Sequence, residues 1–277
     1  MISVASYFFI HNYPSTAPFL SDAERSFIHA RLKNSSDATN TEAFSWAGVR
    51  AGLKDCKCWL YGLGFHTLSL PLYTLSLFFP TIIAALGYTA AQAQLLTVPP
   101  YAFATIFTIA VAVANEKTNK RAPFILASST FAIIGYIILL TTPKSRPGVS
   151  YLGTFFAAGG IYPSTALILS WPAANVSGQT KRATATAMTI TIGNLGAVLG
   201  TQLYRPATSP RFFLGHGFAL GYLVGNLVVT SILWACLSWE NKRKLQELET
   251  RGEGGIANVN DEGQANGDAD PRWIFQT

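Results

Sequence analysis

The stretch WLYGLGFHTLSLPLYTLSLFFPTIIAAL, residues 59–86, contains no aspartate, glutamate, lysine or arginine. The hydrocarbon core of a bilayer is about 30 Å thick, and a helix crosses it with about 20 apolar residues. Backbone N–H and C=O groups inside lipid find partners only within their own segment, so a run of this length is expected to be helical. The stretch therefore predicts a membrane-spanning helix.

Five further uncharged runs follow along the chain, at residues 95–114, 122–140, 151–170, 183–204 and 212–237. Charged residues make up only 12% of the 277 residues, against about 25% in an ordinary soluble domain. The fourteen acidic residues lie within residues 1–57, at Glu116, or beyond Trp239. We therefore predict an all-α membrane protein with six transmembrane helices, for which the lipid bilayer is the solvent.

The flanking regions are polar and divide the chain into three parts. Residues 1–57 precede the six-helix transmembrane domain of residues 58–238, and residues 239–277 follow as a tail. In the first part, Ser21 and Glu24 have the spacing of a capping box that begins a short helix. In the tail, residues 252–270 are rich in glycine, asparagine and aspartate and offer too little apolar surface to order themselves. The tail is therefore expected to be mostly disordered.

The basic residues predict the orientation of the helices. Sixteen of the twenty lysines and arginines lie in every second segment outside the apolar runs, namely residues 1–58, 115–121, 171–182 and 238–277. The positive-inside rule places this side, and with it both termini, in the cytoplasm. Because the basic residues occur in short clusters between apolar runs, the net charge of +6 does not indicate a nucleic-acid partner.

No stretch of the sequence carries an enzyme motif. There is no serine, histidine and aspartate in the order and context of a catalytic triad, no glycine-rich phosphate-binding loop with lysine, and no HExxH zinc motif. Cys56, Cys58 and Cys236 do not suggest a zinc site, since a single C-x-C lacks the second ligand pair. We therefore expect no enzyme activity, no cofactor and no metal.

Polar side chains inside the apolar runs are candidates for a substrate site, because they are costly in lipid. His66 can relay a proton or contact an anionic substrate, or it can be a neutral ring bonded to a neighbouring helix. Asn194, flanked by Gly193 and Gly196, can bind substrate or bridge two helices. Gln202 carries the same two interpretations.

Prolines and glycines point to two more candidates. The segment GGIYP, residues 159–163, can open the fourth run around Tyr162, as transporters do at binding sites, or it can be a packing kink. Tyr73, two residues after Pro71, carries the same alternatives in the first run. Glycines four residues apart, at 196 and 200 and at 217, 221 and 225, predict flat faces on the fifth and sixth runs.

Several stretches together resemble a known family. They are PFLSDAER (18–25), FPTII (79–83), EKTNKRAPF (116–124), Trp171, Asn175, GQTKRA (178–183), GNLG (193–196) and DPRW (270–273). On these residues the chain resembles the C-terminal half of a fungal major facilitator superfamily transporter of the anion:cation symporter group. That group includes the allantoate, nicotinate and pantothenate permeases.

The resemblance implies one half of a twelve-helix transporter in the plasma membrane. Such a transporter moves a small organic anion, such as a carboxylated vitamin, by cation (proton) symport with alternating access. The resemblance also implies a gating role for the loop with Glu116, Lys117 and Arg121, although the family has an Asp-Arg pair where this chain has Glu116-Lys117. A second six-helix half or a homodimer then completes the cavity. The alternative is a truncated, non-transporting membrane fragment of such a transporter.

Overall fold

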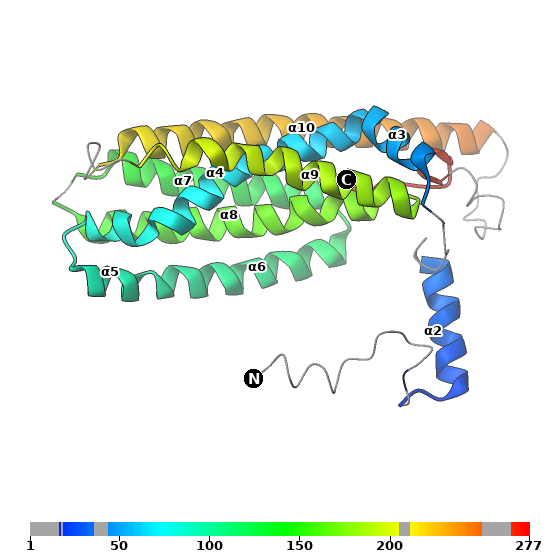
Figure 1. The fold of residues 1–277 in the computed structure, drawn as a ribbon, viewed down its shortest axis with the longest axis horizontal. Coiled ribbons are helices and arrows are strands. Elements are labelled where there is room, and N and C mark those ends of the chain that lie inside the picture. The colour runs from blue at the N-terminus through cyan, green and yellow to red at the C-terminus, as the bar shows by residue number, and fades with distance from the viewer. Residues whose placement is uncertain (1–16, 18, 36–43, 144, 205–210, 251–266) are drawn as a thin grey trace.

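The structure is a computed structural model that describes residues 17, 19–35, 44–143, 145–204, 211–250 and 267–277. The described residues form helices and connections and contain no β-strand. The helices (Figure 1) are α2 (Asp22–Ser35), α3 (Trp46–Lys54), α4 (Cys56–Ala84), α5 (Ala90–Leu96), α6 (Val98–Thr118), α7 (Arg121–Thr141), α8 (Pro147–Asn175), α9 (Gln179–Gly200), α10 (Phe213–Thr250) and the short 3₁₀ turn η5 (Gly267–Ala269).

Within the described residues, six helical stretches are long and apolar enough to cross a membrane. They match the six uncharged runs, so the prediction of an all-α fold with six membrane-spanning helices is confirmed. The second stretch consists of two helices, α5 and α6, that meet at Thr97. The break precedes Pro99 and Pro100, which fit the first turn of α6 because the N–H groups there have no partner within the helix.

Two helices, α4 and α8, lie at the centre of the bundle and contact each other. Their buried side chains include Tyr61 and Trp171, which are both fully enclosed. On one side, α9 packs along α4 and α6 packs along α8. On the other side, α10 packs on α4, α7 packs on α8, and α7 and α10 contact each other. The central pair is therefore covered by α7 and α10 on one side only.

Glycines set how closely the helices approach. A Cβ atom at Gly160 on α8 would lie 2.3 Å from the carbonyl oxygen of Ser128 on α7. A Cβ atom at Gly196 on α9 would lie 2.4 Å from the carbonyl oxygen of His66 on α4. The flat face predicted on the fifth span is therefore packed against α4, since only glycine lets the two backbones approach so closely. The glycines of the last span differ: nothing lies within 4 Å of a Cβ atom built at Gly217 or Gly221.

A buried polar cluster joins α4, α7 and α10. Asn226 on α10 is fully buried. Its Oδ1 accepts a hydrogen bond from Ser129 Oγ on α7 at 2.8 Å, and its Nδ2 donates to Gly64 O and Thr67 Oγ1 on α4, both at 3.0 Å. Since these bonds connect α10 to both α4 and α7 in an apolar interior, the cluster fixes the position of α10 on the bundle.

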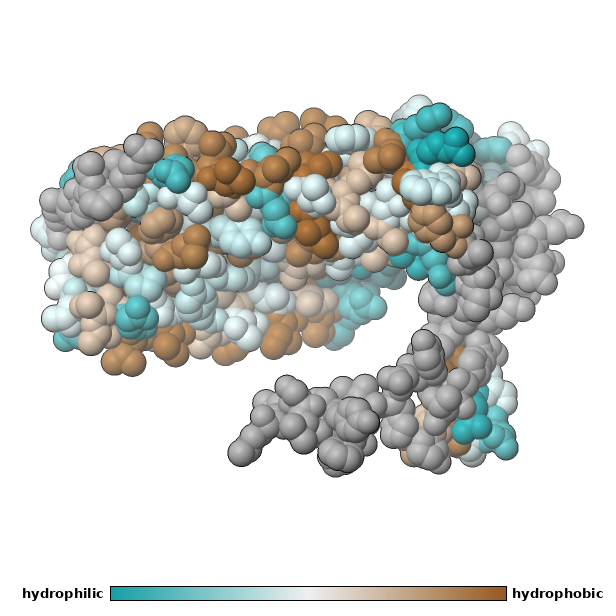
Figure 2. Space-filling view, viewed as in Figure 1, coloured by the Kyte–Doolittle hydropathy of each residue, from teal (hydrophilic) through white to brown (hydrophobic). Residues whose placement is uncertain are grey.

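The surface along the bundle is apolar. Figure 2 shows hydrophobic residues along its length, while the largest group of strongly hydrophilic residues lies at the end where α3 lies and others are scattered singly over the face. Large aliphatic side chains are exposed on several helices, among them Ile106 on α6, Val198 on α9 and Val228 on α10. A water-soluble monomer does not expose apolar surface of this extent, and a multi-pass membrane protein does.

The regions outside the spans are more ordered than their composition indicates. The capping box at the start of α2 forms, since Ser21 N donates to Glu24 Oε2 at 3.0 Å and Glu24 N to Ser21 Oγ at 3.4 Å. Helix α10 continues without interruption to Thr250. Residues 267–277 pack against the bundle, with Phe275 only 3% exposed. The packing of residues 267–277 differs from the mostly disordered tail expected for residues 239–277, and residues 251–266 lie outside the described part of the chain.

Candidate functional site

The candidate site lies on the side of α4 and α8 that α7 and α10 leave uncovered. Thr67 of α4 points to Asn226 on α10. Ser76 follows it by nine residues, which is about two and a half helical turns, so Ser76 lies on the opposite side of α4. We call this side, bordered by α9 and α6, the open face. Its exposed residues include Tyr73, Ser76 and Asn194.

One pair of polar groups on the open face joins α4 and α9. Tyr73 Oη donates a hydrogen bond to Asn194 Oδ1 at 3.2 Å. The tyrosine is 38% exposed, and Asn194 is also exposed. With its oxygen engaged by Tyr73, Asn194 presents its amide nitrogen, a donor of two hydrogen bonds. Two of the residues that the sequence indicated as substrate-site candidates are therefore in direct contact.

The place of Asn194 is set by its neighbour, Gly193. Ser69 Oγ on α4 donates to Gly193 O at 2.5 Å. A Cβ atom at Gly193 would lie 1.9 Å from Cδ1 of Phe65, so no other residue fits between the two helices without moving that ring. Close contact at Gly193 therefore brings α9 onto α4 and holds the Asn194 side chain beside Tyr73.

A second pair joins α4 and α8. Ser76 Oγ and Tyr162 Oη are 2.9 Å apart, and either hydroxyl can be the donor. Whichever donates, the other keeps its own hydrogen for a further bond. The ring of Tyr101 on α6 meets the ring of Tyr162 edge-on, with centroids 5.9 Å apart. The open face thus carries hydroxyl and amide groups beside aromatic rings, supplied by α4, α6, α8 and α9.

The segment around Tyr162 remains helical. Helix α8 runs without a break from Pro147 to Asn175, through Pro163. Gly159 and Gly160 are close-approach positions, since a Cβ atom at Gly159 would lie 2.7 Å from the ring of Phe103 on α6. In the structure these residues therefore have the geometry of the packing interpretation, and Tyr162 is presented from an intact helix.

Two other candidates lie apart from these pairs. His66 Nδ1 donates to the carbonyl oxygen of Ile192 on α9 at 3.0 Å, so its ring is bonded to a neighbouring helix. Its ring also lies 5.7 Å from that of Tyr222 on α10. Gln202 is exposed in the turn after the end of α9. The structure therefore pairs Tyr73 with Asn194 and Tyr162 with Ser76, while His66 bonds to α9 about two turns before Tyr73 and Gln202 lies beyond the end of α9.

The predicted gating loop is the tight connection between α6 and α7. It turns at Asn119, whose φ of +52° is a left-handed conformation that asparagine tolerates. Glu116 and Lys117 are exposed near the end of α6. Arg121, the first residue of α7, donates from Nε to Gln276 Oε1 at 2.9 Å and from its guanidinium to Ser170 Oγ on α8. Of the three loop residues, Arg121 is therefore the one that bonds to other elements.

Sequence reasoning missed Ser76, Tyr101, Ser170 and Gln276. Ser76 had a usable signal, because residues three apart in a helix lie on the same side and Tyr73 was already a candidate. The other three have none, since their roles depend on contacts between separate helices. Among the described residues, no group of three histidine, cysteine, aspartate or glutamate side chains is placed to hold a metal ion.

Comparison with known proteins gives relatives that are transporters. An MFS-type transporter of Penicillium expansum is 35% identical over 244 residues, which is 85% of this chain and 47% of that protein. An uncharacterised transporter of Schizosaccharomyces pombe is 35% identical over 237 residues, 85% of this chain and 48% of that protein. The high-affinity nicotinic acid transporter of Saccharomyces cerevisiae is 29% identical over 226 residues, 82% of this chain and 42% of that protein.

No family model and no solved structure matches the chain. The similarity covers 82–85% of the chain, and the matching proteins are named as transporters rather than as enzymes. The chain spans about half the length of these relatives. It is thus a multi-pass membrane protein similar, over most of its own length, to fungal transporters of the MFS type.

Proposed function

We propose that the chain forms one six-helix half, the C-terminal half, of a major facilitator superfamily transporter, and that its open face lines the substrate path. The observation that carries this proposal is the pair of contacts Tyr73–Asn194 and Ser76–Tyr162, exposed on helices that are apolar enough to span a membrane. Polar groups turned toward hydrocarbon are costly, so a face of this kind is favoured where water, substrate or more protein covers it.

The proposed substrate is a small organic anion such as a carboxylated vitamin. The amide nitrogen of Asn194 and the hydroxyl groups of Tyr162 and Tyr101 are donors that suit a carboxylate, and the tyrosine rings suit a flat apolar body. One relative is named as a transporter of nicotinic acid, and nicotinic acid is such a molecule. Transport then occurs by alternating access, coupled to a cation, with His66 proposed as the group that carries a proton.

The proposed orientation places both termini, α3 and the 267–277 segment on the cytoplasmic side of the plasma membrane. The support is the distribution of lysine and arginine along the chain. In this orientation the α6–α7 connection with Glu116, Lys117 and Arg121 lies at the cytoplasmic gate. The open face needs a partner, which is either a separate six-helix half or a second copy of the chain.

A second candidate function is a truncated, non-transporting fragment of such a transporter. It is supported by the coverage of relatives, since the chain matches only 47% of the Penicillium protein. In this case the open face binds no substrate, and the chain at most associates with a full-length relative.

Uptake by reconstituted protein separates the two. The purified chain is placed in liposomes, alone and with the N-terminal six-helix part of a relative, and uptake of labelled nicotinate and other small carboxylates is measured. Saturable uptake in either preparation supports the transporter. Folded protein that moves no carboxylate in either preparation supports the fragment.

A further inference from the structure

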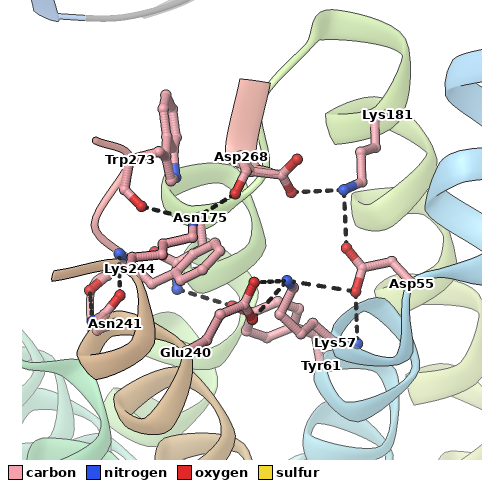
Figure 3. A network of polar contacts seen from close by, with 11 residues as sticks. Asp55, Lys57, Tyr61, Asn175, Lys181, Glu240, Asn241, Lys244, Asp268 and Trp273 are labelled. Atoms are coloured by element: carbon pink, nitrogen blue, oxygen red, sulfur yellow. Dashed lines mark hydrogen bonds and ion pairs between the residues drawn. The ribbon is translucent and has the colours of Figure 1, made fainter. Parts of the chain in front are cut away.

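Residues 267–277 pack against the end of the bundle that holds α3 (Figure 3); they begin with the 3₁₀ turn η5 and end in residues without regular secondary structure. Two asparagine side chains of the bundle bond to the backbones of two successive residues of this segment, Phe275 and Gln276. Asn241 on α10 donates from Nδ2 to Phe275 O at 2.9 Å and accepts from Phe275 N at 2.8 Å. Asn175 on α8 does the same for Gln276, with Nδ2 to O at 2.9 Å and N to Oδ1 at 2.8 Å.

The groups of α8 and α4 at this site are buried, and Asn241 is half-buried. Asn175 is 1% exposed, and Trp171 and Tyr61 are fully enclosed. Trp171 Nε1 donates a second bond to Gln276 O at 2.8 Å, and Asn175 Nδ2 also donates to Tyr61 Oη at 2.9 Å. Because buried donors and acceptors are costly to leave unmade, these side chains require a peptide backbone or an equivalent partner.

Two lysines hold the aromatic side chain of the segment. Phe275 lies 4.1 Å from Lys244 Nζ and 4.6 Å from Lys57 Nζ, measured to the ring centroid. Lys244 Nζ also donates to the carbonyl oxygens of Asp268 at 2.7 Å and Trp273 at 2.9 Å. Cations over an aromatic ring attract its π face, and more strongly where water is excluded.

Carboxylates connect the segment to the other helices. Lys181 at the start of α9 bonds to Asp268 at 2.6 Å and to Asp55, before α4, at 2.9 Å. Partial burial by itself would raise the pKa of Asp270, but the hydrogen bonds and charge of Arg272 outweigh it and keep this pKa below its ordinary value. The carboxylate of Asp270 therefore stays ionised and holds the turn that presents Trp273 and Phe275.

We propose that this end of the bundle is a peptide-binding site whose ligand is the 267–277 segment, and that the bound segment positions Arg121 and the α6–α7 connection. The link is Gln276, whose side chain accepts from Arg121 Nε while its backbone is held by Asn175 and Trp171. Release of the segment removes contacts to α4, α8, α9 and α10 together and removes the bond from Arg121 to Gln276, which leaves Arg121 with its bond to Ser170. That this movement controls a gate rests on the proposed function, while the binding itself does not.

Hydrogen–deuterium exchange on the full chain in lipid nanodiscs tests the proposal, because it requires neither substrate nor transport. In the unchanged protein we expect peptides covering residues 267–277 to exchange at least about tenfold more slowly than an unstructured chain. Phe275→Ala removes the ring from between the lysines and is expected to abolish this protection and to speed exchange at residues 115–121. The matched control is Ile274→Ala, at a neighbouring apolar residue that is 46% exposed, and it is expected to leave both unchanged.

A second variant separates binding from positioning. Gln276→Leu removes the contact to Arg121 but keeps the backbone bonds, so the segment is expected to stay protected while residues 115–121 exchange faster. Unprotected exchange of residues 267–277 in the unchanged chain contradicts the peptide site. Unaltered exchange of residues 115–121 in both Phe275→Ala and Gln276→Leu contradicts the positioning of Arg121. Exchange of the α8 core, read in each variant, shows that the bundle remains folded.

Discussion

The hydroxyl of Tyr73 on α4 donates to the side-chain oxygen of Asn194 on α9, across the interface of two membrane-spanning helices. The bond lies beside Gly193, where the ring of Phe65 packs against the glycine and Ser69 Oγ donates to the Gly193 carbonyl oxygen. Since both side chains are exposed, the contact contributes little burial energy of its own. Its consequence is orientation, because it presents the amide nitrogen of Asn194 on the open face.

Removing either partner is expected to lower uptake more than stability. In proteoliposomes that hold the chain with its completing half, Asn194→Ala and Tyr73→Phe are each expected to reduce the initial rate of carboxylate uptake by about tenfold, the effect of roughly 1.4 kcal/mol. The matched control is Thr130→Val on α7, where an exposed hydroxyl bonds only within its own helix, to Leu126 O. Equal effects at all three positions would show that Tyr73 and Asn194 have no special role.

Substitution of Asn226 is expected to lower stability more than uptake. Asn226 is fully buried and bonds to Ser129, Gly64 and Thr67, so Asn226→Ala removes three hydrogen bonds between helices inside the bundle. Interhelical hydrogen bonds in membranes are worth about 0.6 kcal/mol each on average, and we expect a loss of roughly 1–3 kcal/mol in the free energy of unfolding. Denaturant unfolding in detergent micelles measures it, with Asn194→Ala as the comparison. A larger loss for Asn194→Ala contradicts this assignment.

The glycines of α8 and α10 predict a contrast in tolerance. A Cβ atom added at Gly160 would lie 2.3–2.4 Å from backbone atoms of α7, and backbone cannot move aside as a flexible side chain can. Gly160→Val is therefore expected to cost at least about 1–3 kcal/mol and to lower the thermal midpoint in detergent. Gly217→Ala, where nothing lies within 4 Å, is expected to leave the midpoint unchanged or to raise it slightly. A tolerated Gly160→Val would mean that α7 and α8 are further apart than described.

Asn175 is expected to carry no glycan, although Asn175-Val176-Ser177 is an acceptor sequence. Its Nδ2 is buried and bonds to Tyr61 Oη and Gln276 O, and its side of the membrane is proposed to be cytoplasmic. Glycosidase treatment of the protein made in yeast is therefore expected to cause no mobility shift. The control is Ala207→Asn, which creates a sequon in the connection before α10, expected on the outer side, and which should add a glycan. A glycan on Asn175 overturns both the docking and the orientation.

A structural feature of this protein can be predicted from the sequence when the residues of a single segment determine it. The run at residues 59–86 predicts its helix because lipid requires the backbone bonds of each span to be internal, and the structure has α4 at Cys56–Ala84. Helix α3 was missed, since a nine-residue helix is held by its cap at Ser45 and by contacts of Gly48 and Gly52 with α9. Those contacts join residues more than a hundred positions apart.

The same reasoning explains the tail and the candidate site. Composition predicts disorder for residues 252–270 because it counts only what the segment itself can bury. Residues 267–277 are ordered by groups from elsewhere, the amides of Asn175 and Asn241 and the ammonium of Lys244. On the open face, Tyr73, Tyr162 and Asn194 could be chosen one by one as polar residues in apolar runs. Their pairing, and the share of Ser76 and Tyr101 in it, depends on how the helices pack.

The reaction of a cysteine at position 76 with a water-soluble, membrane-impermeant thiol reagent tests most directly whether the open face lines a path for substrate. Thiolates form and react in water and not in hydrocarbon. In membranes, with the native cysteines replaced by serine, Ser76→Cys is expected to react and to be protected by the transported carboxylate. Ile109→Cys on α6, a residue 60% exposed on the apolar surface, is expected not to react. No labelling of the cysteine at position 76, or equal labelling at positions 76 and 109, would contradict the account.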